Sequence, residues 1–332
     1  MKIVHYGNVW RGYGGTEETV RTLLRRMNER GHDCKAVTWK VTIQRDNMRA
    51  PEEPGVQETY AETEAEAEQN LLSMVDDETV VYTVLLSNNK LWKTLRDRGV
   101  SVVHEYNMPR MGWPDVPGVN FVFNSRYTKS WYPNCDGPVI FPLIDYSKFD
   151  VKTKAPGFNG TIGLINPCIV KGAKIFKKLA LQHPEHQFLS CGGWCHKTDT
   201  DRKLKLPAFD NTRYAGNIER ISDFYNKVDI LLVPTQDKHD ESFGRVLIEG
   251  MYHGCAVIAS YKDAIPEAAG CGAHLVGNYG DWKHWDMALK RVIDNINLYK
   301  SLGDTRTREI DWNRETDHWE RVFMGALDGT GV

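Results

Sequence analysis

Residues 229–260 constrain the fold more than any other part of the sequence. An apolar run over 229–234 leads into a polar loop, and a second apolar run over 256–259 follows a stretch of helical periodicity. Short apolar runs separated by a helical stretch are typical of buried parallel strands joined by a crossover helix. The segment therefore predicts strand, loop, helix and strand within an open parallel sheet.

Two glutamates lie eight positions apart in this segment. Glu241 precedes the predicted helix, and Glu249 lies about two turns further on, roughly 8–10 Å along the axis. Ser242, Phe243 and Gly244 open the helix, so backbone N–H groups and the positive end of the helix dipole would face the carboxyl edge of the sheet. Such edges bind ligands in open α/β sheets, and Glu249 is well placed for two ribose hydroxyls. The alternative is a pair of ordinary exposed helix residues.

The composition is that of an ordinary globular protein. The chain has 332 residues, 41% of them hydrophobic and 26% charged, and a net charge of −2. This length suits two domains. The net charge shows no excess of basic residues that would favour binding to nucleic acid or to an anionic membrane. The sequence shows neither a signal peptide nor an apolar run of membrane-spanning length. Seven scattered cysteines favour free thiols and a cytoplasmic location.

Apolar and helical stretches alternate along the chain in two successive sets. The first set predicts strands at 2–6, 34–38, 79–86, 100–104 and 120–124, and helices at 17–29 and 61–68. A turn-rich segment, 133–147, separates the sets. The second predicts strands at 160–165, 187–190, 212–215, 229–234 and 256–259, and helices at 173–181 and 221–227. This alternation predicts an α/β fold with two Rossmann-like, doubly wound domains facing across a cleft.

A glycine-rich loop joins the first predicted strand to the first helix. Gly14 and Gly15 permit close approach of a ligand to the backbone, and Thr16 can cap the helix. The spacing is not the G-x-G-x-x-G of dinucleotide-binding folds, so an ordinary glycine turn is the alternative.

Two further residues follow predicted strands. His104 ends the strand over 100–104 and is predicted to point into a loop, where an imidazole can position or deprotonate a hydroxyl. Lys171 lies between the strand over 160–165 and the next helix, where its charge suits a diphosphate. A structural histidine and a solvated lysine are the alternatives.

Taken in order, these elements resemble the retaining glycosyltransferases of the GT-B fold, family 4 (glycosyl transferases group 1). The matching pieces span residues 1 to about 270 and include Gly14-Gly15 with Glu17, His104-Glu105 with Pro109, 123–128, Lys171-Gly172, Glu241 with Glu249, and Ile265-Pro266-Glu267. The Glu-x7-Glu element is the most specific of them.

The resemblance implies transfer of a sugar from a nucleotide-sugar donor, UDP- or GDP-linked, to an acceptor hydroxyl with retention. No cofactor or metal is expected for the chemistry. The implied catalytic residues are His104, Lys171 and Glu241. The implied donor-binding residues are Gly14, Gly15, Asn166, Lys171, Ser242, Phe243, Gly244 and Glu249.

The resemblance also implies a division of the chain. Residues 1–142 would form an acceptor-side domain completed by a C-terminal helix within 308–332, and 143–307 would bind the donor. The compact first half favours a large or polymeric acceptor. Another GT-B enzyme, such as a sugar-nucleotide epimerase or hydrolase, and a non-catalytic nucleotide-sugar-binding protein are the alternatives.

Two positions depart from the family pattern. Asn166 stands where an arginine is usual, which removes a guanidinium from the diphosphate site, and Asp263-Ala264 replaces a usual Gly-Gly pair. Asp199-Thr-Asp201 spells the carboxylate pair of metal-dependent transferases, but its polar surroundings predict a loop.

Overall fold

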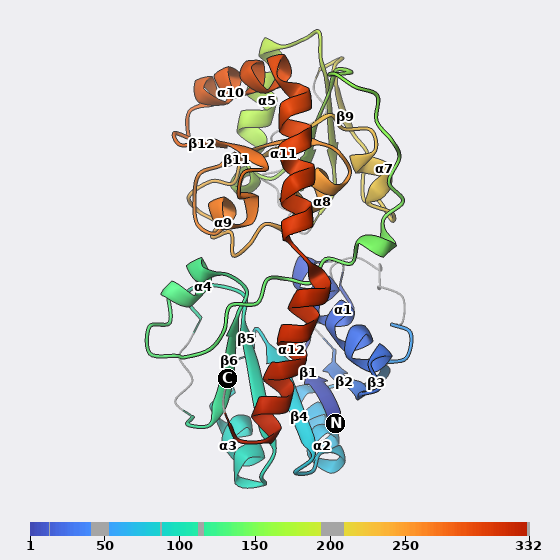
Figure 1. The fold of residues 1–332 in the computed structure, drawn as a ribbon, viewed down its shortest axis with the longest axis vertical. Coiled ribbons are helices and arrows are strands. Elements are labelled where there is room, and N and C mark those ends of the chain that lie inside the picture. The colour runs from blue at the N-terminus through green and yellow to red at the C-terminus, as the bar shows by residue number, and fades with distance from the viewer. Residues whose placement is uncertain (13, 41–52, 87, 112–115, 194–208, 331–332) are drawn as a thin grey trace. The chain divides into compact units, whose positions relative to one another are not determined.

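The computed structural model describes residues 1–12, 14–40, 53–86, 88–111, 116–193 and 209–330. The chain forms two compact units, Met1–Ile144 with Trp312–Val332, and Asp145–Asp311 (Figure 1). The sequence places the divisions after residues 142 and 307. Among the described residues, no helix combines the length and apolarity needed to cross a membrane. Cys195, Asp199 and Asp201 lie outside the described residues.

The first unit is built on a six-stranded parallel sheet. Its strand order is β3-β2-β1-β4-β5-β6, the order of a dinucleotide-binding Rossmann sheet. The strands are β1 (Lys2–Tyr6), β2 (Asp33–Trp39), β3 (Gln57–Ala61), β4 (Thr79–Val84), β5 (Ser101–Tyr106) and β6 (Val119–Phe123). The helices are α1 (Gly15–Glu29), α2 (Glu64–Met74), α3 (Asn89–Asp97), α4 (Arg126–Ser130) and α12 (Trp312–Leu327).

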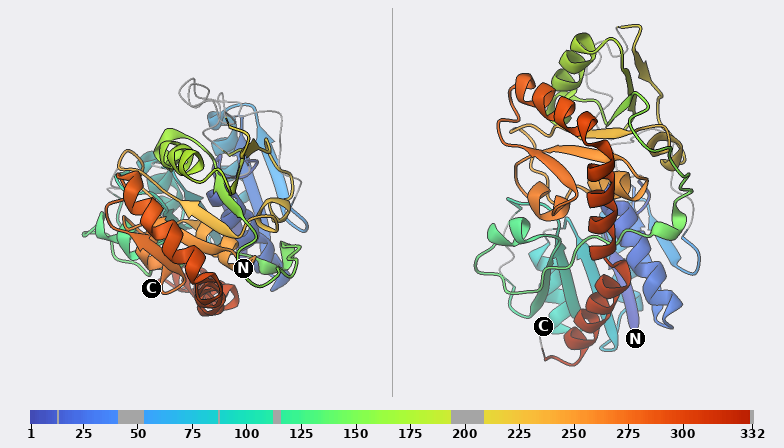
Figure 2. Two further views of the ribbon diagram at one scale, coloured as in Figure 1. Left: turned by 90° about the horizontal axis from the view of Figure 1, so that it is seen from above. Right: turned by 45° about the horizontal axis from the view of Figure 1, so that its top comes forward.

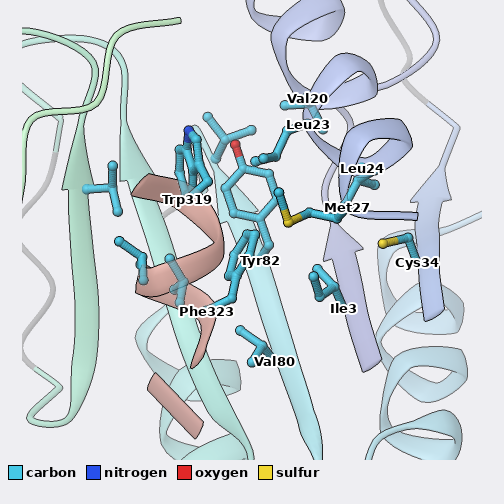
Figure 3. Packing of buried hydrophobic residues seen from close by; sticks show 14 of the residues in the cluster. Ile3, Val20, Leu23, Leu24, Met27, Cys34, Val80, Tyr82, Trp319 and Phe323 are labelled. Atoms are coloured by element: carbon cyan, nitrogen blue, oxygen red, sulfur yellow. The ribbon is translucent and has the colours of Figure 1, made fainter. Parts of the chain in front are cut away.

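Helices α1 and α12 bury one face of this sheet. Leu23 and Met27 of α1 lie in one buried cluster with Tyr82 of β4 and with Trp319 and Phe323 of α12 (Figure 3). The Tyr82 ring meets the other two rings edge-on, at centroid distances of 5.4 and 5.9 Å. Helices α2 and α3 cover the opposite face. The last helix of the chain is thus part of the first core.

The second unit repeats this architecture. Its order, β12-β11-β10-β7-β8-β9, is the same Rossmann order when the strands are counted from β7. The strands are β7 (Thr161–Ile165), β8 (Gln187–Cys191), β9 (Thr212–Tyr214), β10 (Ile230–Val233), β11 (Ala256–Ser260) and β12 (Ala273–Val276). The prediction of an α/β fold with two doubly wound sheets is confirmed.

Helices cover both faces of the second sheet (Figures 1 and 2). Helices α5 and α10 pack on one face and α8 and α11 on the other. The helical elements are η1 (Tyr146–Lys148), η2 (Ile169–Lys171), α5 (Ala173–Gln182), α7 (Ser222–Tyr225), α8 (Arg245–Tyr252), α9 (Ile265–Ala269), α10 (Trp282–Asp294) and α11 (Ile296–Glu309).

Gly172 makes the turn between η2 and α5. Its φ of +82° is left-handed, and a Cβ there would lie 2.2 Å from the carbonyl oxygen of Pro234, which follows β10. Only glycine satisfies both the backbone angle and this close approach. The contact sets the start of α5 against the end of β10.

We predict that Gly172→Ala destabilises the protein by clearly more than Gly157→Ala. Gly157 has nearly the same φ, +85°, but its Cβ would meet no atom within 4 Å. Gly157→Ala therefore measures the backbone effect alone, about 1 kcal/mol, whereas Gly172→Ala adds overpacking of roughly 1–3 kcal/mol. Urea denaturation of both variants measures the difference. Equal losses would contradict the role given to the Pro234 contact.

Candidate active site

The candidate site lies at the carboxyl edge of the second sheet. Lys171 follows β7, Glu241 follows β10, and Asp263 follows β11, and these three strands are consecutive neighbours. The helix after β7 covers one face of the sheet and the helix after β10 covers the other. The β7–β10 boundary is therefore the topological switch point at which open α/β sheets bind their ligands.

Lys171 and Glu241 form an ion pair at this edge. Lys171 Nζ lies 2.5 Å from Glu241 Oε2, and the two side chains are only 15% and 13% exposed. Thr235 Oγ1 donates a weaker hydrogen bond, 3.4 Å long, to the same oxygen. Burial raises the pKa of the Glu241 carboxyl, but the ammonium of Lys171 outweighs it, so the pKa lies below its ordinary value. Glu241 is consequently ionised at neutral pH.

Asp263 fixes the backbone of Glu241. Its Oδ2 accepts a hydrogen bond of 2.9 Å from the Glu241 amide and lies 3.0 Å from Lys262 Nζ. The Ala264 amide donates to the Glu241 carbonyl oxygen over 3.1 Å. Asp263 itself has a φ of +51°, a region in which aspartate is tolerated. The Asp263-Ala264 departure thus organises the loop that carries Glu241.

The segment Ser242–Gly244 leads into α8. Gly244 adopts a φ of +93° at the helix N-cap, and the helix begins at Arg245. Phe243 is buried, so its side chain belongs to the core. Since α8 begins at Arg245, Glu249 lies only four residues, about 6 Å, beyond the first helical residue. The helix therefore begins a few residues later than expected, and only about one turn of it precedes Glu249.

Both carboxylate oxygens of Glu249 have partners. Arg245 Nε donates to Oε1 over 3.3 Å, and the Tyr225 hydroxyl donates to Oε2 over 3.1 Å. These two contacts hold the carboxylate in one orientation at the start of α8. Each oxygen keeps a second lone pair for a further donor such as a ribose hydroxyl.

Asn166 is a turn residue at the end of β7. Its φ is +61°, its amide donates to Cys191 O over 2.9 Å, and its carbonyl accepts from the Cys168 amide over 2.7 Å. The side chain packs against Gly193. Asparagine is one of the few residues that adopt left-handed angles readily, which accounts for asparagine in place of arginine. A phosphate contact by Asn166 stays a prediction.

The cysteines differ in part from expectation. Cys34, Cys135, Cys191, Cys255 and Cys271 are free thiols, whereas the expectation is wrong for Cys168, which is disulfide-bonded. Cys168 immediately precedes η2, whose last residue is Lys171. The covalent bond therefore anchors the turn that carries the lysine.

The glycine loop of the first unit is organised by charged residues. Gly14 caps α1 and Gly15 is its first residue, and the Glu17 carboxylate folds over Gly14. Arg21, which is 4% exposed, donates to Gly12 O over 2.8 Å and pairs with Glu18 at the same distance. The roles of Gly14 and Gly15 in donor binding stay predictions.

His104 lies inside β5 and not at its end. The strand continues to Tyr106, and the His104 side chain is fully buried between the rings of Trp92 and Tyr106, at centroid distances of 4.8 and 4.7 Å. The Thr83 hydroxyl lies 2.9 Å from Nδ1. Burial lowers the pKa of His104 to about 3. The expected position in a loop is wrong, and a catalytic contact by His104 stays a prediction.

Glu105 is a buried acid that the sequence analysis gave no role. It is 3% exposed, it accepts a hydrogen bond from the Tyr82 hydroxyl, and burial raises its pKa to about 7. The only sequence signal is a carboxylate inside an apolar strand. Glu105 is a structural acid of the first core.

A family comparison covers most of the second unit. Residues 170–308 match the family model described as Glycosyl transferases group 1. The matched segment contains Lys171, Glu241 and Glu249. No curated protein matches the sequence.

Solved structures resemble the chain over nearly its whole length. A glycosyltransferase from Rickettsia africae ESF-5 has a TM-score of 0.74 at 16% identity, covering 98% of this chain and 98% of its own. Alr3699/HepE from Anabaena, solved with UDP and glucose, has a TM-score of 0.73 at 13% identity, covering 97% and 98%. A trehalose-6-phosphate synthase has a TM-score of 0.68 at 11% identity, covering 99% of both chains. At these identities the likeness concerns the fold.

The fold and the matched segment together define the class of protein. The chain is a glycosyltransferase of the GT-B fold, and its residues 170–308 belong to the glycosyl transferases group 1 family.

We predict that Asn166→Arg lowers stability without strengthening nucleotide binding. Arginine lacks the tolerance of asparagine for φ of +61°, at a cost of about 1 kcal/mol, and the position is 5% exposed. Asn166→Gly is the matched control, since glycine adopts this angle freely. Urea denaturation and a nucleoside diphosphate titration measure the two effects. Tighter binding at unchanged stability would instead make position 166 a phosphate contact.

We predict that Glu105→Gln reduces the pH dependence of stability between pH 4.5 and 7. The folded-state pKa, about 7, exceeds the ordinary value of 4.5, so the protonated carboxyl stabilises the folded protein at low pH. That contribution, up to about 3 kcal/mol, is lost as the pH rises through 7.

Glutamine keeps the contact with Tyr82 and does not titrate, so the variant gains stability relative to the parent as the pH rises. Urea denaturation from pH 5 to 8 measures this, with Glu64→Gln on the exposed face of α2 as the control. Parallel curves for Glu105→Gln and the parent would overturn the prediction.

Proposed function

We propose that the protein transfers a hexose from a nucleoside diphosphate sugar to an acceptor hydroxyl, with retention at the anomeric carbon and without a catalytic metal. One observation carries the proposal. The Lys171–Glu241 ion pair lies at the switch point of the second sheet, inside the segment that matches the family.

Lys171 is proposed to bind the donor diphosphate. A departing diphosphate needs cationic stabilisation from a preorganised site, and a lysine held at the start of a helix supplies it. The disulfide at Cys168 and the turn at Gly172 both restrict the position of this lysine. The backbone of Ser242–Gly244 is proposed as a further donor contact.

Glu249 and Glu241 are proposed to bind the rest of the donor. The Glu249 carboxylate, oriented by Arg245 and Tyr225, is proposed to accept hydrogen bonds from the ribose. Glu241 is proposed to lie near the reacting sugar, because a diphosphate bound by Lys171 would lie next to Glu241.

The donor class and the stereochemistry are proposed by analogy. The Anabaena structure contains UDP and glucose, and the trehalose-6-phosphate synthase was studied for glycosyl transfer with retention. These likenesses support a UDP- or GDP-linked hexose and a retaining mechanism for this chain. A large or polymeric acceptor is proposed from the compact first unit.

Metal independence is supported by the charges at the site. Glu241 is paired with Lys171 and Asp263 with Lys262. A divalent cation would have to displace an ammonium from each carboxylate, whereas a diphosphate gains from the same lysines.

We predict opposite effects for two substitutions in the ion pair. Lys171→Ala removes the cation and should weaken nucleoside diphosphate binding about 10- to 100-fold. Glu241→Gln removes the negative charge that competes for Lys171, so the nucleotide should bind as tightly as to the parent or more tightly, while transfer is lost. Thermal shifts and calorimetry with UDP, GDP, ADP, dTDP and CDP, with and without EDTA, measure binding.

Lys178→Ala is the matched control, because Lys178 is an exposed lysine of α5, the helix that follows Lys171. The anomer released on slow donor hydrolysis, followed by NMR before mutarotation, tests retention. Conversion of the donor sugar itself would indicate an epimerase. Nucleotide binding with no change of rate in Glu241→Gln would indicate a non-catalytic relative.

A further inference from the structure

A second cluster of ionisable side chains lies at the opposite edge of the second sheet. His183, Glu185 and His186 connect the end of α5 to the start of β8. Because β8 runs parallel to β7, this connection lies at the amino ends of the strands, away from Lys171 and Glu241. The proposed transferase chemistry makes no use of it.

The three side chains place donor atoms close together. Glu185 Oε1 lies 3.1 Å from His183 Nδ1 and 3.6 Å from His186 Nε2, and all three ligand atoms are within 4.8 Å of one another. A tetrahedral ion with bonds of about 2.0–2.1 Å has ligand atoms about 3.3–3.4 Å apart. The two distances from Glu185, 3.1 and 3.6 Å, lie on either side of that value. The third distance joins His183 Nδ1 and His186 Nε2. It reaches a similar value when the half-buried His186 ring and the exposed Glu185 side chain rotate.

Asp286 of α10 orients the most buried of the three ligands. His183 is 6% exposed, and its Nε2 lies 2.6 Å from Asp286 Oδ1. The contact with the Asp286 carboxylate orients the ring so that Nδ1 faces Glu185 Oε1 over 3.1 Å. A histidine whose other nitrogen donates to a carboxylate is the usual arrangement of a metal ligand.

The backbone of the connection is held in place by one buried amide. Asn211 Nδ2 donates to the carbonyl oxygens of Ala180, His183 and His186 over 3.0, 3.1 and 3.1 Å. The ring of Phe158 meets the His186 ring edge-on at 4.9 Å. The ligands therefore stand on a preorganised segment.

We propose that His183 Nδ1, Glu185 and His186 Nε2 bind one zinc ion, with water as the fourth ligand. Two imidazoles and one carboxylate suit zinc and its neighbours in the first transition row, whereas calcium and magnesium take oxygen ligands. The ion ties the end of α5 to the start of β8 and, through Asp286, to α10.

The test is zinc binding by the full chain after treatment with EDTA and removal of the chelator. Calorimetry should show one site per chain that raises the melting temperature, and Co²⁺ should give the intense visible bands of a tetrahedral site. Glu185→Gln and His186→Ala should each weaken zinc binding at least about 10-fold. Asp286→Asn should weaken it about 10- to 100-fold, as expected of a partner that orients a ligand.

His284→Ala is the matched control. His284 forms a similar exposed pair with Asp281, at 3.4 Å, but belongs to no three-donor group among the described residues. Its replacement should leave zinc affinity unchanged. Glu185 is exposed, so Glu185→Gln should remain folded, which circular dichroism checks. No zinc binding by the parent protein, or binding unaffected by Glu185→Gln and His186→Ala, would overturn the proposal.

Discussion

The ion pair between Lys171 and Glu241 connects the loops that follow β7 and β10, and Asp263 joins the loop after β11 to them. Lys171 is placed by the turn at Gly172, which only glycine can make against the Pro234 carbonyl. Glu241 is placed by the Asp263 carboxylate, which holds its amide. The geometry of the carboxyl edge therefore depends on contacts between loops far apart in sequence.

The same pair explains how donor binding would act on the reacting sugar. Two opposing influences set the pKa of Glu241: burial raises it and the Lys171 ammonium lowers it. In the proposed complex the diphosphate shares that ammonium, so the lowering influence weakens and the pKa of Glu241 rises. The carboxyl then becomes a better hydrogen-bond partner for sugar hydroxyls. In the proposed complex, donor binding and sugar positioning would be coupled through Lys171, and a neutral residue at position 171 or 241 would remove that coupling.

The sequence predicted most of the strands because they are apolar and buried on both faces. It missed β3, Gln57–Ala61, whose residues are mostly polar and half-buried at the sheet edge, and it also missed β12 at the other sheet's edge. It gave no prediction for the helices α3, α4, α9, α10 and α11. His104 was misplaced because the predicted strand ended two residues before β5 does. Contacts such as Arg25 with Glu53 and His183 with Asp286 join residues remote in sequence, so local patterns give no sign of them.

The two edges of the second sheet carry opposite electrostatics, and this bears on any experiment with a chelator. At the carboxyl edge, lysines neutralise Glu241 and Asp263, and an anion is the favoured ligand. At the amino edge, Glu185 and Asp286 flank His183, and a cation is favoured.

Helix α5 runs between the two edges of the sheet, with Lys171 before its first turn and His183 after its last. Loss of an ion at one end would loosen the helix that positions the lysine at the other. EDTA would then lower the stability of the protein without any metal taking part in glycosyl transfer. The nucleotide affinity of Glu185→Gln distinguishes loss of this ion from loss of a metal at the transfer site.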